Sequence, residues 1–207
     1  MASRQNRGFT LVELLVAITV MAIVAVLGWR GLDTIVRARV ALTQDLEQTR
    51  GIQLAFAQMQ SDCAHIVQPS NIAGHATLLT GPQRVTMVRT VFAENQPSRV
   101  QVVVYRLRDG KLSRYESPAT RDLTELDSMW QAAIDETNAA PGILLQSDVG
   151  QMSIDSLFRN SSGSGVSNTP PAATPQGNVA MPVGLQVVLQ LNGHETGMTK
   201  IFLLGAV

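Results

Sequence analysis

A single carboxylate interrupts the most apolar stretch of this sequence. From Phe9 to Leu27 the chain reads FTLVELLVAITVMAIVAVL, and Glu13 is its only ionisable residue. A helix of this length covers roughly 28 Å, close to the hydrocarbon thickness of a bilayer. A charged group there costs about 2.5 to 3.5 kcal/mol on insertion scales, so it should have a partner or a task. The alternative is that Glu13 lies near the membrane edge and extends its charge toward the headgroups.

The flanks of the apolar stretch predict its orientation. Residues 1–8 carry Arg4 and Arg7 and no acidic residue, and basic residues beside a span mark its cytoplasmic side. Three arginines between residues 30 and 39 weaken this asymmetry, but the far side must hold the rest of the chain. The apolar stretch runs into helix-like sequence instead of a small-residue cleavage site, which favours a retained anchor over a secretory signal peptide.

Other residue types that could perform chemistry are dispersed. His65, His75 and His194 lack the spacing of a metal site, and we expect them to be surface or partly covered residues. Asp148 and Asp155 do not form a calcium-loop pattern. The sequence contains no nucleophile elbow and no phosphate loop. These observations argue against an enzyme and predict neither cofactor nor metal.

Composition excludes further classes of function. The 16 basic and 16 acidic residues balance, and aromatic residues make up only 4% of the chain. The basic residues form no stripe of the kind that neutralises phosphates, so no nucleic-acid partner is expected. Cys63 is the only cysteine, which excludes an intramolecular disulfide. We expect it to be a small buried residue on a helix.

Helical periodicity continues beyond the apolar stretch. From Arg30 to about Gln68 the chain has no proline, and apolar residues recur at spacings of three and four, the mark of a helix with one covered face. These residues are Leu42, Leu46, Thr49, Ile52, Phe56, Met59, Cys63 and Ile66. The pattern predicts a helix that leaves the membrane and packs on a folded domain.

After residue 77 the period changes to two, which predicts strands. The clearest are 84–92, 99–107 and 112–117, the last two joined by an Asp109-Gly110 turn. Residues 142–146 and 149–158 are weaker candidates, and 122–136 has the pattern of a short amphipathic helix. A terminal hairpin, 184–191 and 198–205, turns near Asn192-Gly193. Helix first and then consecutive strands predicts an α+β fold, with the long helix packed on an antiparallel β-sheet.

The N-terminal residues resemble a known family. RGFTLVELLVAI, from Arg7 to Ile18, is similar to the N-terminus of type IV pilins and of the pseudopilins of type II secretion, with a basic leader, glycine, phenylalanine and a glutamate five positions after the glycine. In that family a prepilin peptidase cuts after the glycine on the cytoplasmic side and methylates the new amine. The resemblance implies cleavage between Gly8 and Phe9, with Phe9 as the methylated first residue.

Such cleavage would give Glu13 a partner. The amine created at Phe9 lies about 6 Å along the helix axis from Glu13. A neighbouring subunit shifted along a filament could place its own amine against this carboxylate, and the ion pair would offset the cost of desolvation. We therefore expect Glu13 to act in assembly, while packing of the apolar helices forms the filament core.

A more diffuse similarity, across most of the chain, is to the J-type minor pseudopilin of type II secretion. It rests on GWRGLDTIVRAR, AFAQMQSDC, VVVYRLRDGKLSRYESP and the terminal IFLLG. The J type has the pseudopilin fold and joins I- and K-type partners in a hetero-oligomer at the pseudopilus tip. Glu13 counts against the K type, which lacks it. The Ser/Pro-rich loop at 160–178 departs from the J type and leaves open a W-type minor pilin of the type IV pilus.

The expected organisation follows. Residues 1–8 are the leader, 9–29 the transmembrane and filament-core helix, and 30–207 a periplasmic domain with an amphipathic helix at 30–68, a mainly β region at 77–207 and a flexible loop at 160–178. The expected function is that of a structural subunit in the inner membrane, processed by prepilin peptidase and supporting protein secretion. A binding module that touches DNA, a surface or an exported protein is the other class consistent with the sequence.

Overall fold

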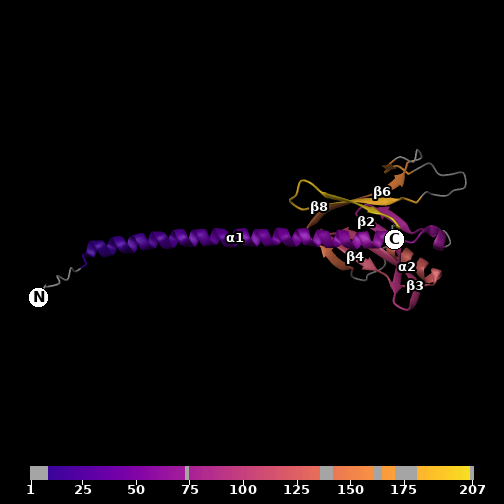
Figure 1. The fold of residues 1–207 in the computed structure, drawn as a ribbon, viewed down its shortest axis with the longest axis horizontal. Coiled ribbons are helices and arrows are strands. Elements are labelled where there is room, and N and C mark those ends of the chain that lie inside the picture. Colours follow the sequence, from indigo (N-terminus) through magenta and orange to yellow (C-terminus); the bar gives the residue numbers. More distant parts are fainter. Residues whose placement is uncertain (1–8, 73–74, 136–141, 161–164, 171–180, 206–207) are drawn as a thin grey trace. The chain divides into compact units, whose positions relative to one another are not determined.

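The computed structural model describes residues 9–72, 75–135, 142–160, 165–170 and 181–205. The chain divides into two compact units, residues 1–47 and 48–207, and each is described by itself. Helix α1, Leu11–Ala64, contributes to both. The second unit contains the C-terminal part of α1, two sheets and helix α2 (Figure 1).

Helix α1 ends four residues earlier than the sequence pattern predicts. At Ile66 the chain has left the helix and forms an isolated antiparallel bridge with Arg89, and the next amide, that of Val67, donates to the carbonyl of Val88 at 2.9 Å. A short 3-10 helix, Pro69–Ile72, follows. Pairing with a strand thus competes successfully with the last predicted turn of the helix.

The predicted apolar face of this helix is only partly covered. Ile52, Phe56, Met59 and Cys63 are buried, whereas the three earlier members of the pattern are exposed, with Leu42 at 65% and Leu46 at 64% and Thr49 also exposed. The prediction of one continuous covered face from Leu42 onward is therefore wrong for this chain by itself. The physical reason is that the folded unit begins near residue 48, so the sheets provide packing partners only from there.

The strands form two antiparallel sheets, where the sequence indicated one. The first has the order β1-β2-β3-β4-β5 and the second the order β7-β6-β8-β9. Their bounds are Leu78–Gly81 for β1, Arg84–Ala93 for β2, Gln96–Arg108 for β3, Lys111–Glu116 for β4, Ile143–Gln146 for β5, Val149–Arg159 for β6, Val166–Ser167 for β7, Gly184–Leu191 for β8 and Met198–Leu203 for β9.

Both predicted turns are present. Asp109 and Gly110, between β3 and β4, have positive φ angles of 50° and 72°, as a two-residue hairpin turn with a right-handed strand twist requires. Gly193, between β8 and β9, has a φ of 80°. Part of the predicted loop at 160–178 is a strand instead, because β7 pairs with the end of β6. Residues 161–164 and 171–178 of that loop lie outside the described residues.

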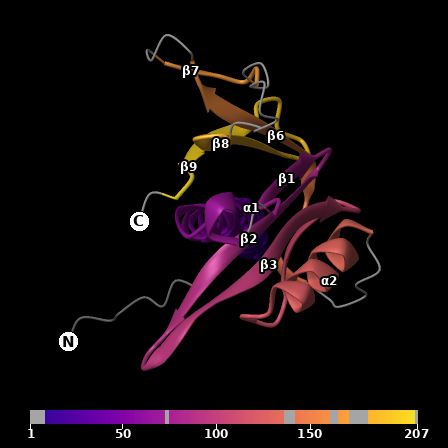
Figure 2. The same cartoon turned by 90° about the vertical axis from the view of Figure 1, so that its right-hand side faces the viewer.

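The main core forms where the buried face of α1 meets both sheets. Ile52, Phe56 and Met59 pack with Tyr105 and Leu112 of the first sheet, and the same core includes residues of the second sheet, among them Leu185, Leu189 and Phe202. Figure 2 shows α1 in the angle between the sheets. Burial of large apolar side chains is worth about 1.5 to 3 kcal/mol each, so this junction accounts for much of the stability of the unit.

Helix α2, Leu123–Ile134, covers the other face of the first sheet (Figure 2). Leu126, Trp130 and Ala133 are buried in a second cluster with Val88 and Val102. The helix begins at the N-cap Asp122, whose side chain accepts a hydrogen bond from the Thr124 amide at 2.8 Å. The amphipathic helix predicted at 122–136 is thus confirmed, with bounds two residues shorter at its C-terminal end.

Candidate functional site

The first site that the sequence singles out is the start of α1. Gly8 lies outside the described residues, Phe9 is 84% exposed, and the helix begins at Leu11. The Glu13 amide donates to the carbonyl of Thr10 at 3.1 Å and to its hydroxyl at 3.3 Å. Thr10 therefore satisfies a backbone donor in the first turn and fixes where the helix starts.

The Glu13 side chain is exposed on this helix. None of the ion pairs found among the described residues involves it. It is also the acidic residue in the first turn of α1, where a negative charge is favoured by the helix dipole. The structure thus presents a carboxylate at a helix start with no basic partner in the described part of its own chain.

The apolar residues around Glu13 are also uncovered. Large side chains from Leu11 to Leu27 are each more than half exposed, and among the described residues α1 is the one helix long and apolar enough to cross a membrane. An apolar surface of this extent marks contact with lipid or with other proteins. This part of α1 is the part that would form both a membrane anchor and the core of a filament.

A second group of ionisable residues lies in the folded unit, and the sequence analysis missed it. Asp62, on the buried side of α1, is fully buried. Its carboxylate accepts from Arg114, with Nε at 2.7 Å and Nη2 at 3.1 Å, from Arg89 Nη1 at 2.5 Å and from the Tyr105 hydroxyl at 2.5 Å. Arg114 also donates to Glu116 at 2.6 Å.

This ion cluster, Asp62, Arg89, Tyr105, Arg114 and Glu116, ties α1 to strands β2, β3 and β4. Asp62, Tyr105 and Arg114 are buried, Arg89 is partly buried and Glu116 is exposed. Two acidic and two basic groups balance, and the buried Asp62 carboxylate, which also accepts from Gln58 Nε2 at 3.5 Å, is well satisfied. The cluster therefore fixes which face of α1 meets the first sheet. The signal that could have revealed it is the position of Asp62, three residues after Met59 and four before Ile66, on a face that is otherwise apolar.

Neighbouring groups titrate far from their ordinary range because of this environment. Burial, and then the charge of Asp62, raise the pKa of Tyr105. Burial by itself would lower the pKa of Arg114, but its hydrogen bonds with Asp62 and Glu116 raise it overall. Burial and Asp62 also raise the pKa of the Cys63 thiol to about 12. Cys63 is buried as predicted, and its thiol stays protonated at neutral pH, which makes it unreactive.

The histidines do not come together. His65 hydrogen-bonds within its own helical turn, His75 contacts Asp127 at 2.8 Å, and His194 is exposed. Across the part of the chain that the structure describes, no group of three potential ligands could hold a metal ion. The described residues thus offer apolar surfaces for packing, and the ion cluster around Asp62 stabilises the fold.

Comparison with protein families agrees with both parts of the structure. A model of the prokaryotic N-terminal methylation motif matches residues 3–29, and a model of type II secretion system protein J matches residues 30–204. The chain belongs to the type II secretion system protein J family. The J-family match covers most of the folded unit and part of α1. A comparison with curated proteins found no match.

Family membership and fold together define the class of molecule. The chain is a minor pseudopilin of type II secretion, with a helix that crosses the inner membrane once and a C-terminal folded unit outside it. The helix-plus-antiparallel-sheet architecture is the α+β pseudopilin fold that the resemblance implied. Neither family match favours the W-type pilin alternative.

Proposed function

We propose that this J-family subunit acts at the tip of the pseudopilus and is assembled there through Glu13. A prepilin peptidase removes residues 1–8 by cutting between Gly8 and Phe9 and methylates the Phe9 amine. The subunit then joins I- and K-type minor pseudopilins in a hetero-oligomer that supports protein secretion. Its role is structural, and it carries out no catalysis.

The observation that carries this proposal is Glu13, which lies within an exposed apolar helix and has no ion-pair partner among the residues that the structure describes. In lipid an isolated carboxylate is unfavourable, while the terminal amine of an adjacent subunit is a cation of matching size. A pair between them is made only when one helix is shifted along its neighbour by about one turn. Assembly therefore both satisfies the charge and selects the axial register of the filament.

The apolar residues supply the attraction, and Glu13 supplies the specificity. Helices in a membrane gain from packing and from polar contacts between them. A polar residue at one position of a helical interface fixes register at some cost in stability. These separate roles explain why the apolar helix contains the charge of Glu13, although the helix would insert into the membrane more easily without it.

The test is a set of substitutions at Glu13 in a host with a complete secretion system. Glu13→Gln keeps the shape but removes the charge, and Glu13→Ala removes both. We expect both variants to reach the membrane and to fold, but to enter the assembly at least about tenfold less, as loss of an ion pair worth about 1.4 kcal/mol implies. Co-purification with partner pseudopilins and secretion of an exported enzyme measure the effect.

The matched control is Asp33→Ala. Asp33 is an acidic residue on the same helix, but it already pairs with Arg37 of its own chain at 2.9 Å. Exposed pairs of this kind contribute little, so this variant should assemble normally. Normal assembly and secretion by Glu13→Gln would contradict the register role of the carboxylate.

A further inference from the structure

Strand β6 has an edge that is paired over only a small part of its length. One edge pairs with β8 from Val149 to Leu157. On the other edge β7 pairs with Phe158 and Arg159 alone. Within the described ranges, no strand pairs with residues 150–157 on that side.

The backbone groups at this edge point outward in a regular way. The carbonyl of Leu157 accepts from Val183 next to β8, at 2.7 Å, and the amide of Asn160 donates to Gly165 next to β7, at 3.1 Å. Because backbone groups alternate in direction along a strand, Met152, Ile154 and Ser156 direct their amides and carbonyls away from β8. No backbone partner for these outward groups is found in the described part of the chain.

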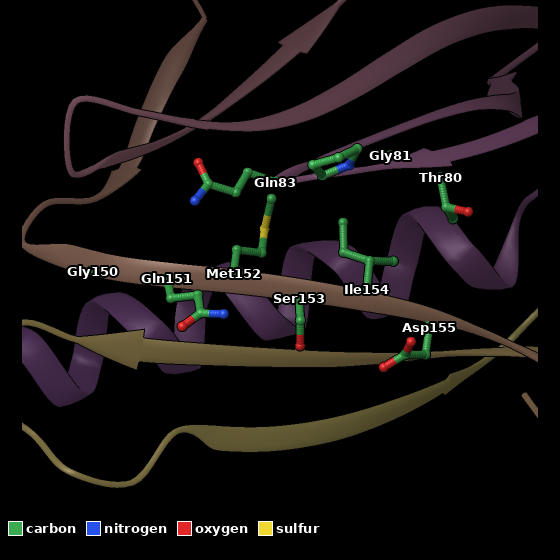
Figure 3. A pocket seen from close by; sticks show the side chains of 10 residues that line it. Thr80, Gly81, Gln83, Gly150, Gln151, Met152, Ser153, Ile154 and Asp155 are labelled. Atoms are coloured by element: carbon green, nitrogen blue, oxygen red, sulfur yellow. The ribbon is translucent and has the colours of Figure 1, made fainter.

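A cavity of about 500 Å³ runs along the same edge. It is lined by the end of β1 and the turn that follows it, residues 80–83, and by residues 150–155 of β6. Figure 3 shows Met152 and Ile154 on one side of β6 and Ser153 and Asp155 on the other. Since side chains of both faces line the cavity, it follows the edge of the strand. Met152 is buried in the main core, whereas Ile154 and Ser156 are partly exposed, so the outward backbone groups that a partner can reach are those of Ile154 and Ser156.

The other sheet edges, at β1, β5, β7 and β9, are less suited to accept a strand. Strand β9 places Lys200 over the rings of Phe56 and Phe202, with Nζ at 5.9 and 5.7 Å from their centroids, and an inward-pointing charge on an edge strand discourages further pairing. Strands β1 and β5 have four residues each and β7 has two, which limits the number of hydrogen bonds they can offer. The edge of β6 combines length, free backbone groups and a cavity.

We propose that this β6 groove, residues 80–83 and 150–155, accepts an extended segment of a partner pseudopilin as an added strand. Main-chain hydrogen bonds to Ile154 and Ser156, which are partly exposed, would hold the segment, and side-chain pockets would select it. Its alternate residues are apolar toward Ile154. Asp155 is exposed and is the only ionisable residue that lines the cavity, so the segment carries a basic residue opposite it.

The size of the groove favours a partner in the same membrane, and this step rests on the proposed function. Stable complexes between freely diffusing proteins bury about 1,200 to 2,000 Å², more than one short strand in a groove provides. Two subunits anchored side by side gain a high effective concentration, so a weak second contact becomes populated. An exported protein that reaches the pseudopilus tip is not anchored beside the subunit, so it lacks this high effective concentration.

The test uses a photo-crosslinking amino acid in the full-length chain, in membranes of a host with a complete secretion system. Introduced at Gln151, it reports on the β6 groove, and at Thr199 it reports on the β9 edge. At Leu15, in the anchor helix, it reports on assembly. We expect mass spectrometry to map the Gln151 adduct to one continuous segment of a partner pseudopilin that has alternating apolar residues and a basic residue.

Two substitutions check the mode of binding. Asp155→Arg should lower the yield of the Gln151 adduct by about fivefold, because like charges opposite each other disfavour strand pairing, while Asp155→Asn has a smaller effect. Ser156→Pro removes an outward amide and should abolish the adduct, whereas Ser156→Ala retains it. Limited proteolysis of each variant verifies that the unit is folded, and the Asp155 variants serve if proline disturbs it.

The outcomes separate the groove from the assembly role. If Leu15 adducts persist but Gln151 gives no partner adduct, or gives one to an exported protein or to a helical segment, the strand-acceptor proposal is wrong. The same holds if partner adducts arise from Thr199 alone or if Asp155→Arg leaves the Gln151 yield unchanged. Loss of the Leu15 adducts as well would contradict the proposed assembly function itself.

Discussion

At the scale of single residues, two carboxylates on one helix have opposite environments. Glu13 is exposed and has no basic partner in the described part of its chain, while Asp62 is fully buried and accepts hydrogen bonds from two arginines and a tyrosine. We propose that the first is satisfied by a neighbouring subunit, whereas the second is satisfied within the fold. The sequence analysis identified Glu13 because it is the one charged residue in an apolar run. It missed Asp62 because the residues around Asp62 have an ordinary helical pattern.

Removal of Asp62 should be costly. The substitution Asp62→Ala leaves the buried Arg114 with Glu116 as its remaining carboxylate partner and removes the carboxylate that pairs with the partly buried Arg89, and breaking a buried pair costs about 3 to 5 kcal/mol of unfolding free energy. Denaturation by urea, followed by the fluorescence of Trp130 in a Trp29→Phe background, measures this change. Asp33→Ala is the control and should change the unfolding free energy by less than about 1 kcal/mol. A loss below 1 kcal/mol in Asp62→Ala would contradict the role assigned to the ion cluster.

At the scale of elements, local signals decide where segments start and turn, and packing decides where they end. The turn at Asp109-Gly110 and the start of α2 at Asp122 follow from local backbone chemistry. The end of α1 does not, because the bridge between Ile66 and Arg89 depends on a strand far along the chain. The two-residue strand β7 likewise depends on pairing with β6, and its own sequence gives no strand signal.

The cap of α2 gives a prediction at this scale. Asp122→Ala removes the acceptor for the Thr124 amide and should lower the unfolding free energy by about 1 kcal/mol. Asp122→Ser preserves an acceptor and should behave like the unmodified protein within a few tenths of that amount. Because Trp130 lies on α2, its fluorescence during denaturation reports the change directly. Equal stability of the alanine and serine variants would show that the cap contributes nothing.

At the scale of the whole molecule, the chain combines a membrane helix with a unit built around the same helix. The N-terminal methylation motif and the protein J family divide the sequence at residue 30, inside the continuous helix α1. The proposed assembly thus uses one half of a helix whose other half packs in a folded core. A substitution in either half of α1 is therefore a substitution in one continuous helix.

Processing provides the prediction for the whole molecule. In a host with its prepilin peptidase, mass spectrometry of the mature chain should find Phe9 at the N-terminus, with the mass of one added methyl group. Gly8→Ala is expected to leave residues 1–8 attached and to block assembly, since the amine that pairs with Glu13 is then absent. Mature protein that retains Met1 or Ala2 in a working secretion system would overturn this account of the N-terminus.

The sequence by itself determined the anchor, the candidate residues Gly8, Phe9 and Glu13, the periodicity of most strands and the position of both hairpin turns. These features are local, because hydrophobic periodicity and turn chemistry act between near neighbours along the chain. The role of Glu13 remains a prediction, since its proposed partner belongs to another subunit.

Tertiary structure decided what depends on contacts between distant segments. It separated the strands into two sheets, limited the covered face of α1 to residues from Ile52 onward, and gathered Asp62, Tyr105 and Arg114 from a helix and two strands. It also left an edge of β6 beside a cavity. The burial of a side chain and the pairing of strands depend on which distant segments pack together, so the pattern of residues along the sequence does not specify them.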